Sequence, residues 1–291
     1  MRFTVRIALT AFFALSASAA AALELPAFKD RLFAYSGILS QADGGDYRIV
    51  DYDEMRDING RDEIPERRVE ANYVSLRVNR EQRDLVLDTA FGKVRHYAVG
   101  KADNANLIVM YLHGQGGSRQ QGVNDYTFGG NFNRIKNLVA VADGLYLVPD
   151  FPDFDQGGAR HLAALLHHYA ARSPNARVVI ACGSMGGSLC WWLGRDRRIA
   201  ERLGGLMLMG SLWDPSFFDS PAFRLKVPVF FGQGSRDKVF PVERMEAFYR
   251  EIRQRAPGYP VRMVRFETGS HGTPIRMIDW RETINWMLSA K

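Results

Sequence analysis

Short runs of apolar residues alternate with amphipathic stretches over most of the chain. A continuous apolar run is typical of a strand buried on both faces, and apolar residues spaced three and four apart indicate a helix. The pattern predicts strands at 73–78, 84–87, 94–99, 107–112, 145–148, 177–181, 206–209, 227–231 and 261–266. It predicts helices at 131–141, 159–171, 187–193, 242–253 and 278–288. Strands that alternate with helices in this way predict an α/β fold built on a mainly parallel sheet.

The first 22 residues differ from this pattern. Arg2 and Arg6 precede an apolar run at 7–15, and the small residues Ala17-Ser18-Ala19 follow it. These are the three parts of a secretory signal peptide, so we expect export to the periplasm, the cell envelope or the medium. An uncleaved membrane anchor is the alternative, because the apolar stretch up to Leu23 is at the lower limit of a bilayer span.

Residues 23–70 form a polar extension between the leader and the main pattern. Turn signals stand at Gly44-Gly45 and Asn59-Gly60, and the segment has no strong hydrophobic period. We assign no function to it. The catalytic domain is expected to span residues 71–291.

Composition and charge narrow the class of protein. The hydrophobic fraction is 46% and the charged fraction 24%, which is typical of a globular protein and excludes a disordered chain. The net charge of +6 includes Arg2 and Arg6, so a chain without its leader carries about +4. Because basic and acidic residues are interleaved, we expect a mixed surface, with contact to an anionic membrane as the second interpretation and no nucleic-acid partner.

The chain has two cysteines, Cys182 and Cys190, which are too few for a Cys-rich zinc module or a disulfide-stapled mini-domain. They are expected at the end of a strand and on the following helix. A disulfide requires Cα atoms within ~7 Å of each other. We expect these positions to lie farther apart and both residues to be buried free thiols.

The strongest chemical signal is the sequence Cys-Gly-Ser-Met-Gly-Gly at 182–187, between a predicted strand and a predicted helix. A serine hydroxyl becomes a nucleophile only when a base removes its proton. A sharp turn from strand to helix exposes such a serine, and it requires small neighbours. Gly183, Gly186 and Gly187 meet that requirement around Ser184.

A second glycine-rich loop, His113-Gly-Gln-Gly-Gly-Ser, directly follows the strand predicted at 107–112. Its glycines allow a backbone N–H to point toward Ser184. The N–H groups of Gln115 and Met185 are therefore the candidate oxyanion hole, a set of donors that stabilises the charged intermediate of acyl transfer. We expect the His113 side chain to support the loop.

Two later strands end near a carboxylate and a histidine. Asp237 follows the strand at 227–231, and His271 follows the strand at 261–266. A histidine base for Ser184 needs a carboxylate that orients its ring and stabilises its charged form. Asp214, which follows an earlier strand, is the rival acid.

Together these four motifs resemble those of the α/β-hydrolase superfamily of serine esterases and lipases, from about residue 85 to the end. The order Ser184, Asp237, His271 is the order of the triad in that superfamily. The family elbow is Gly-x-Ser-x-Gly, and Cys182 stands here in place of the first glycine. The resemblance implies an α/β-hydrolase fold with helices on both faces of a mainly parallel sheet, and it implies no metal and no cofactor.

The expected activity is hydrolysis of a carboxylic ester through an acyl-enzyme on Ser184. Only residues 213–226 separate two successive predicted strands, so we expect little or no cap over the site. Export and an open site favour lipid or phospholipid acyl esters of the cell envelope as substrates. The alternatives are an acyltransferase that uses the same triad and a non-catalytic envelope-binding protein on a hydrolase scaffold.

Overall fold

The structure is a computed structural model that describes residues 23–290. The leader predicted at 1–22 lies outside the described residues, as does Lys291. Export therefore stays a prediction of the sequence.

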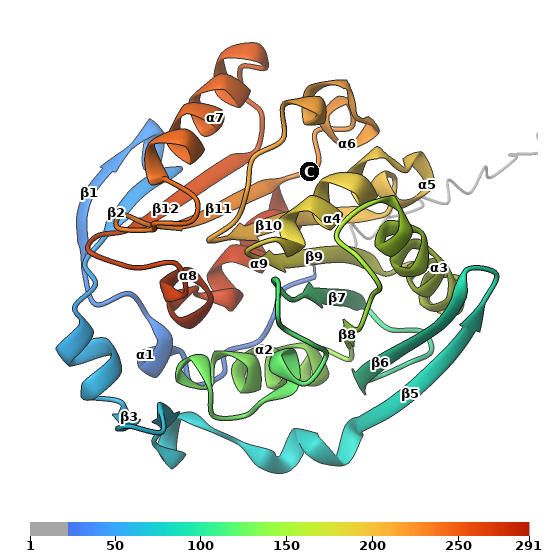
Figure 1. Ribbon diagram of the computed structural model, residues 1–291, viewed down its shortest axis with the longest axis horizontal. Helices are drawn as coiled ribbons and strands as arrows, with labels where there is room; N and C mark the ends of the chain where they lie inside the picture. The colour runs from blue at the N-terminus through green and yellow to red at the C-terminus, as the bar shows by residue number, and fades with distance from the viewer. Residues whose placement is uncertain (1–22, 291) are drawn as a thin grey trace, which may run out of the picture.

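Ten strands form one sheet within residues 23–290, in the order β1-β2-β12-β11-β10-β9-β7-β8-β6-β5 (Figure 1). The strands are β1 (Ile38–Ala42), β2 (Tyr47–Val50), β5 (Gln82–Thr89), β6 (Gly92–Gly100), β7 (Leu107–Leu112), β8 (Leu145–Pro149), β9 (Arg177–Gly183), β10 (Leu203–Met209), β11 (Val229–Gly234) and β12 (Val261–Phe266). From β2 to β8 all neighbouring strands are parallel, and β1, β6 and β5 pair in antiparallel fashion. A separate small sheet pairs β3 (Asp62–Glu63) with β4 (Arg68–Val69).

Helices cover both faces of the sheet. They are α1 (Asp30–Phe33), α2 (Asn131–Val141), α3 (Gln156–Arg172), α4 (Gly186–Arg195), α5 (Arg197–Ala200), α6 (Pro221–Arg224), α7 (Val242–Arg255), α8 (Thr273–Met277) and α9 (Trp280–Ser289). One apolar core joins α3, α4 and α7 to the sheet, and the other joins α2, α8 and α9 to its opposite face. In β7, Ile108 and Met110 belong to the first core, whereas Leu107 and Val109 belong to the second. This double burial explains the continuous apolar runs and confirms the predicted fold class.

The strand predicted at 73–78 is wrong. The segment is made of two short 3₁₀ helices, η3 (Ala71–Tyr73) and η4 (Leu76–Glu81), joined by residues 74–75, and η4 lies against α2. The reason is local: the backbone N–H of Ser75 donates to the side chain of Asn133, and Asn137 donates to the carbonyl of Ser75. These amide side chains occupy the backbone groups that a neighbouring strand would have used.

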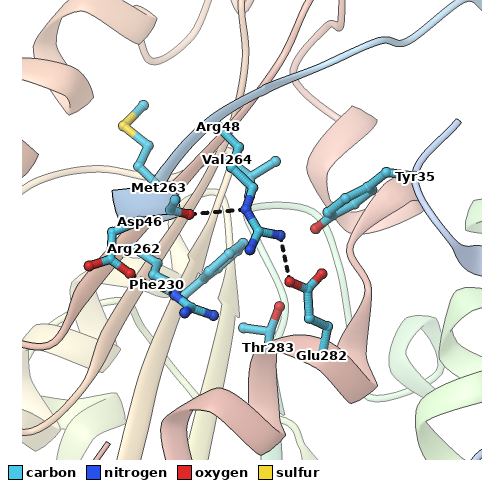
Figure 2. Close-up of a pocket in the computed structure, with 10 residues that line it drawn as sticks. Tyr35, Asp46, Arg48, Phe230, Arg262, Met263, Val264, Glu282 and Thr283 are labelled. Carbon is cyan, nitrogen blue, oxygen red and sulfur yellow. Dashed lines mark hydrogen bonds and ion pairs between the residues drawn. The ribbon is translucent and has the colours of Figure 1, made fainter. Parts of the chain in front are cut away.

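Residues 23–70 contribute two strands to the main sheet, and the sequence pattern predicted neither of them. β2 pairs in parallel with β12, and β1 forms the exposed edge beside it. The guanidinium of Arg48 on β2 donates to the carbonyl of Gly45 and pairs with the carboxylate of Glu282 on α9, and Figure 2 shows the pairing with Glu282. Because every β1 side chain is exposed, the strand lacks the alternation of apolar and polar residues that marks a half-buried strand.

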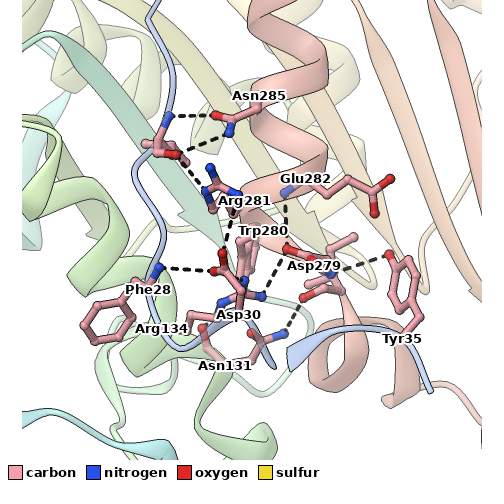
Figure 3. Close-up of polar contacts among 12 residues, drawn as sticks. Phe28, Asp30, Tyr35, Asn131, Arg134, Asp279, Trp280, Arg281, Glu282 and Asn285 are labelled. Atoms are coloured by element: carbon pink, nitrogen blue, oxygen red, sulfur yellow. Dashed lines mark hydrogen bonds and ion pairs between the residues drawn. The ribbon is translucent and has the colours of Figure 1, made fainter. Parts of the chain in front are cut away.

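The residues just after the leader are held against α2 and α9 (Figure 3). Leu25 is fully buried, its N–H donates to Asn285, and its carbonyl accepts from Arg281 over 2.8 Å. The fully buried Arg134 of α2 pairs with Asp30 at 3.1 Å. From β2 the chain then runs past α2 to β5 at the opposite edge of the sheet, as Figure 1 shows. The chain from residue 23 to β5 therefore lies alongside the helix layer and connects the two edges of the sheet.

Candidate active site

Ser184 stands at the turn between β9 and α4. Its backbone has φ of +51°, in the left-handed region that non-glycine residues rarely adopt. Its N–H donates to the carbonyl of Met209, and its own carbonyl accepts from the hydroxyl of Ser211. Strained residues persist only where the surroundings hold them, and these two contacts hold the serine at the apex of the turn.

Glycines let α4 approach the neighbouring strand closely. A Cβ atom on Gly186 would lie 2.6 Å from the carbonyl oxygen of Leu112 and 2.8 Å from that of His113. A Cβ atom on Gly114 would lie 2.7 Å from the Cβ of Ser184. Only glycine fits at both positions, so the glycines place the loop after β7 directly beside the serine.

Three side chains from three strand ends meet at this point. The Oγ atom of Ser184 lies 2.9 Å from Nε2 of His271, and Nδ1 of His271 lies 2.8 Å from Oδ2 of Asp237. An ionised carboxylate only accepts hydrogen bonds, so Nδ1 carries the proton that faces Asp237. Nε2 is then free to accept the proton of the serine hydroxyl. Ser184, His271 and Asp237 thus have the geometry of a nucleophile, a base and an acid that orients the base.

The carboxylate of Asp237 is buried and surrounded by donors. Burial by itself would raise the pKa of Asp237, but hydrogen bonds from His271 and from the N–H groups of Phe240 and Val239 outweigh it and lower the pKa. Gln233 of β11 also donates to this carboxylate over 2.7 Å. Asp237 therefore stays ionised and can stabilise a positive charge on His271.

Sequence analysis did not identify Gln233. It lies in β11 and is fully buried, and its amide also donates to the carbonyl of Phe240. The available signal was a glutamine between two glycines at the end of an apolar run, four residues before the acid. A polar side chain placed there is buried only if it has a partner, and that partner is Asp237.

Solved structures with the same architecture are known. No protein-family model and no curated protein matches the sequence. The chain superposes on an esterase of Pyrococcus furiosus with a TM-score of 0.52 and 16% identity, covering 72% of this chain and 91% of that one. A thermostable esterase gives a TM-score of 0.57 at 17% identity, over 72% and 63% of the two chains. A serine hydrolase without a lid from Xanthomonas campestris gives 0.50 at 18% identity, over 70% and 92%.

This protein has the α/β-hydrolase fold. The resemblance inferred from the four motifs is thus confirmed at the level of the fold. The fold places its ligands at the carboxyl ends of the parallel strands, and that is the edge at which Ser184, Asp237 and His271 lie. Among residues 23–290 no separate cap is evident, because only η7 (Pro215–Asp219) and α6 connect β10 to β11.

The two candidate oxyanion donors come from the elbow and from the loop after β7. Met185 immediately follows Ser184, and Gln115 follows Gly114, whose backbone approaches the serine side chain. Within the described part of the chain, the N–H groups of Gln115 and Met185 donate no hydrogen bond. Both groups are therefore available to an oxygen atom of a substrate.

His113 packs beneath its own loop, as expected. Its ring stacks on Phe151 with centroids 4.3 Å apart, and Nδ1 lies 2.8 Å from the carbonyl of Gly114. Burial lowers the pKa of His113, so the neutral ring is favoured. These contacts give it a supporting role in the loop.

Asp214, the rival acid, is engaged elsewhere. Its carboxylate accepts from the N–H of Ser216 at the start of η7 and forms an ion pair with Arg195 at 2.7 Å. The structure brings Asp237, and not Asp214, against His271.

Cys182 and Cys190 form a disulfide, so the prediction of two free thiols is wrong. Their Cα atoms are 6.4 Å apart, within the limit for a disulfide. The sharp elbow at Ser184 turns α4 back along β9, which brings Cys190 over the strand end that carries Cys182. The sequence analysis took the two positions to lie farther apart because it did not include the close packing of this turn.

We expect Cys190→Ala to lower the free energy of unfolding by about 2–3 kcal/mol, the stabilisation expected for a disulfide that closes a short loop. Denaturant unfolding of protein purified from an oxidising compartment measures this change. The double variant Cys182→Ala/Cys190→Ala should lose about as much as the single one, because both remove the same bond. Two reactive thiols in the denatured, unreduced wild type would contradict the disulfide.

Other candidate sites are not supported by the described residues. Within 23–290, no group of three or more His, Cys, Asp or Glu residues is arranged to hold a metal ion. In the same range, no helix combines the length and the apolar character needed to span a bilayer.

Proposed function

We propose that this protein is a serine hydrolase that cleaves carboxylic esters through an acyl-enzyme. The observation that carries the proposal is the hydrogen-bonded series from Ser184 through His271 to Asp237 at a strained strand-to-helix turn. The hydrogen bond between Nδ1 of His271 and Asp237 leaves Nε2 facing the hydroxyl of Ser184. The fold and the absence of an evident cap within residues 23–290 leave room for an ester beside the serine.

The first half of the reaction forms the acyl-enzyme. His271 Nε2 accepts the proton of Ser184 as Oγ attacks the ester carbonyl carbon. The carbonyl oxygen becomes an oxyanion, which the N–H groups of Gln115 and Met185 stabilise; one such donor is worth about 10²–10³ in rate. The protonated His271 then gives its proton to the alcohol oxygen, the carbon–oxygen bond breaks, and the alcohol leaves.

The second half releases the acid. His271 accepts a proton from water as the water oxygen attacks the acyl carbon on Ser184. The second oxyanion collapses, the bond to Oγ breaks, and Ser184 recovers its proton from His271. Throughout, the ionised Asp237 orients the ring and stabilises its positive charge.

We further propose that the enzyme is exported and acts on acyl esters of envelope lipids, phospholipids included. The predicted leader supports export, and the disulfide at the elbow supports it too, since disulfides persist in oxidising compartments. The open site and the mildly basic surface, which suits peripheral contact with an anionic membrane, support a lipid substrate. Release of fatty acid from phospholipid vesicles tests this preference, and no release at any chain length would reject it.

Labelling with a fluorophosphonate tests the nucleophile directly. We expect stoichiometric labelling of the wild type at Ser184, no labelling of Ser184→Ala, and normal labelling of Ser188→Ala on the same helix. Hydrolysis should be measured in parallel on a panel from acetyl to palmitoyl esters. A wild type that fails to label would favour a non-catalytic binding protein. Acyl transfer to added glycerol that exceeds hydrolysis would favour an acyltransferase.

A further inference from the structure

A pocket of about 280 Å³ lies at the loop that carries His271. Ser270 and Gly272, the two neighbours of His271 in the chain, form one side of it. Thr127 and Phe128, from the loop before α2, form the second side. Tyr52, Ile58 and Arg67, from the N-terminal segment, form the third. The segment to which the sequence assigned no function thus supplies one wall of a pocket at the candidate site.

Arginine side chains tie these walls together. Arg276 on α8 donates to both carboxylate oxygens of Asp62, at 2.7 and 2.8 Å, and to the carbonyl of Asp57 at 2.8 Å. Arg61 donates to the carbonyl of Gly129 at 3.2 Å. The side chains of Arg61, Arg276, Asp57 and Asp62 are all buried. A bidentate arginine–carboxylate pair is geometrically specific, so the N-terminal wall is fixed to the element that follows His271.

The second wall is held in a strained conformation. Phe128 has φ of +51°, a value that is uncommon for a residue with a side chain. Gly129 and Gly130, which follow it, also have positive φ. The ring of Phe128 packs edge-on against Phe132 of α2, with centroids 5.6 Å apart. Strain of this kind costs about 1–3 kcal/mol and clusters at ligand sites. The pocket is therefore preformed on two sides.

The position of the pocket relative to His271 indicates which half of an ester it receives. In the proposed reaction the leaving oxygen must come within hydrogen-bond reach of Nε2 of His271. In that reaction the carbonyl oxygen instead faces the N–H group of Gln115, on the loop after β7, and the N–H group of Met185, on the elbow. The group attached to the leaving oxygen therefore extends toward the residues that flank His271.

We infer that this pocket binds the alcohol half of the ester, and that the N-terminal segment limits the size of that alcohol. The inference rests on the proposed function and adds its leaving-group specificity. The pocket's volume of about 280 Å³ has room for a compact organic group and not only for single water molecules. Tyr52, Ile58 and Phe128 present apolar surface to it. The preferred alcohol is compact and apolar, of the size of hexanol or benzyl alcohol, and a larger one extends out of the mouth.

Two substrate series test the inference. In the first, the acyl group is acetyl and the alcohol is ethanol, butanol, hexanol or benzyl alcohol. In the second, the alcohol is p-nitrophenol and the acyl group runs from acetyl to octanoyl. Thr127→Phe should lower the ratio of kcat/KM for benzyl acetate to that for ethyl acetate by about tenfold, because a few misfitting carbon atoms are worth this much in an apolar pocket. Ile58→Ala should raise the ratio of kcat/KM for hexyl acetate to that for ethyl acetate, because the shorter side chain enlarges the pocket.

The acyl series should keep its order of preference in both variants. Met55→Ala is the matched control, because Met55 lies on the same π-helix as Ile58 (η2, Met55–Asn59) but is exposed and outside the pocket. A change of acyl preference in Thr127→Phe would overturn the inference in favour of an acyl pocket. Unchanged ratios in both pocket variants would overturn it as well.

Failure of the inference and failure of the proposed function are distinguishable. A wild type that labels with fluorophosphonate and hydrolyses esters, but whose alcohol preference is insensitive to both variants, would retain the proposed function and reject the pocket. A wild type that neither labels nor hydrolyses any ester would reject both.

Discussion

Ser184→Ala is expected to lower kcat/KM for ester hydrolysis by about 10⁵–10⁶-fold, since removal of a triad nucleophile abolishes the acyl-enzyme route. His271 and Asp237 supply no nucleophile that could replace this hydroxyl in forming the acyl-enzyme. Hydrolysis of p-nitrophenyl butyrate by the wild type and the variant measures the loss. The free energy of unfolding should change little, because the hydroxyl has a single described partner, Nε2 of His271.

Ser188→Ala, on the same helix, is the matched control and should retain the activity of the wild type. Equal activity in Ser184→Ala and the wild type would contradict the serine mechanism. If the wild type transfers acyl groups to glycerol and Ser184→Ala does not, Ser184 remains the nucleophile, and the acyl acceptor is an alcohol instead of water.

The second large effect concerns the acid. Asp237→Asn is expected to lower kcat by about 10³–10⁴-fold, because an amide in place of the carboxylate favours the wrong tautomer of the histidine and cannot stabilise its charged form. The variant keeps the shape of the side chain. It leaves the N–H groups of Val239 and Phe240 with an amide oxygen as acceptor. Single-turnover kinetics with a p-nitrophenyl ester measure the acylation step in which this loss should appear.

Asp214→Asn provides the matched control for this variant. Asp214 caps η7 and pairs with Arg195, so the change should cost some stability and alter kcat by less than about tenfold. A larger loss of kcat in Asp214→Asn than in Asp237→Asn would assign the acid role to Asp214 and contradict the geometry.

The described structure confirms the parts of the fold that depend on short-range pattern. The predicted strands at 107–112 and 261–266 and the predicted helix at 131–141 have the bounds of β7, β12 and α2. Both strands are rich in apolar residues that a two-sided core requires. The elbow could be located because its glycines and its serine are adjacent in the chain, and adjacency is what a local pattern records.

A residue pattern fails to predict the structure of a segment when contacts with other parts of the fold determine that structure. Residues 73–78 have the apolar alternation of a strand, but amide side chains of α2 bind their backbone instead. β1 is absent from the prediction because an exposed edge strand carries no alternation. β2, which lies between β1 and β12, was also missed. The cysteines were taken as too far apart because the separation of two atoms across an elbow depends on how closely the helix returns to its strand.

The sequence by itself determined the class of fold, and it predicted the candidate nucleophile and the order of the candidate triad along the chain. These follow from periodicity and from residues that stand together at strand ends. Only the tertiary structure decided that Asp237 and not Asp214 faces His271, that Gln233 supports this acid, and that the cysteines are bonded. It also decided that Tyr52, Ile58 and Arg67 border the site. The physical reason is that all these contacts, between residues from 4 to 219 positions apart, depend on how helices and strands pack, which the pattern of residue types along the chain does not record.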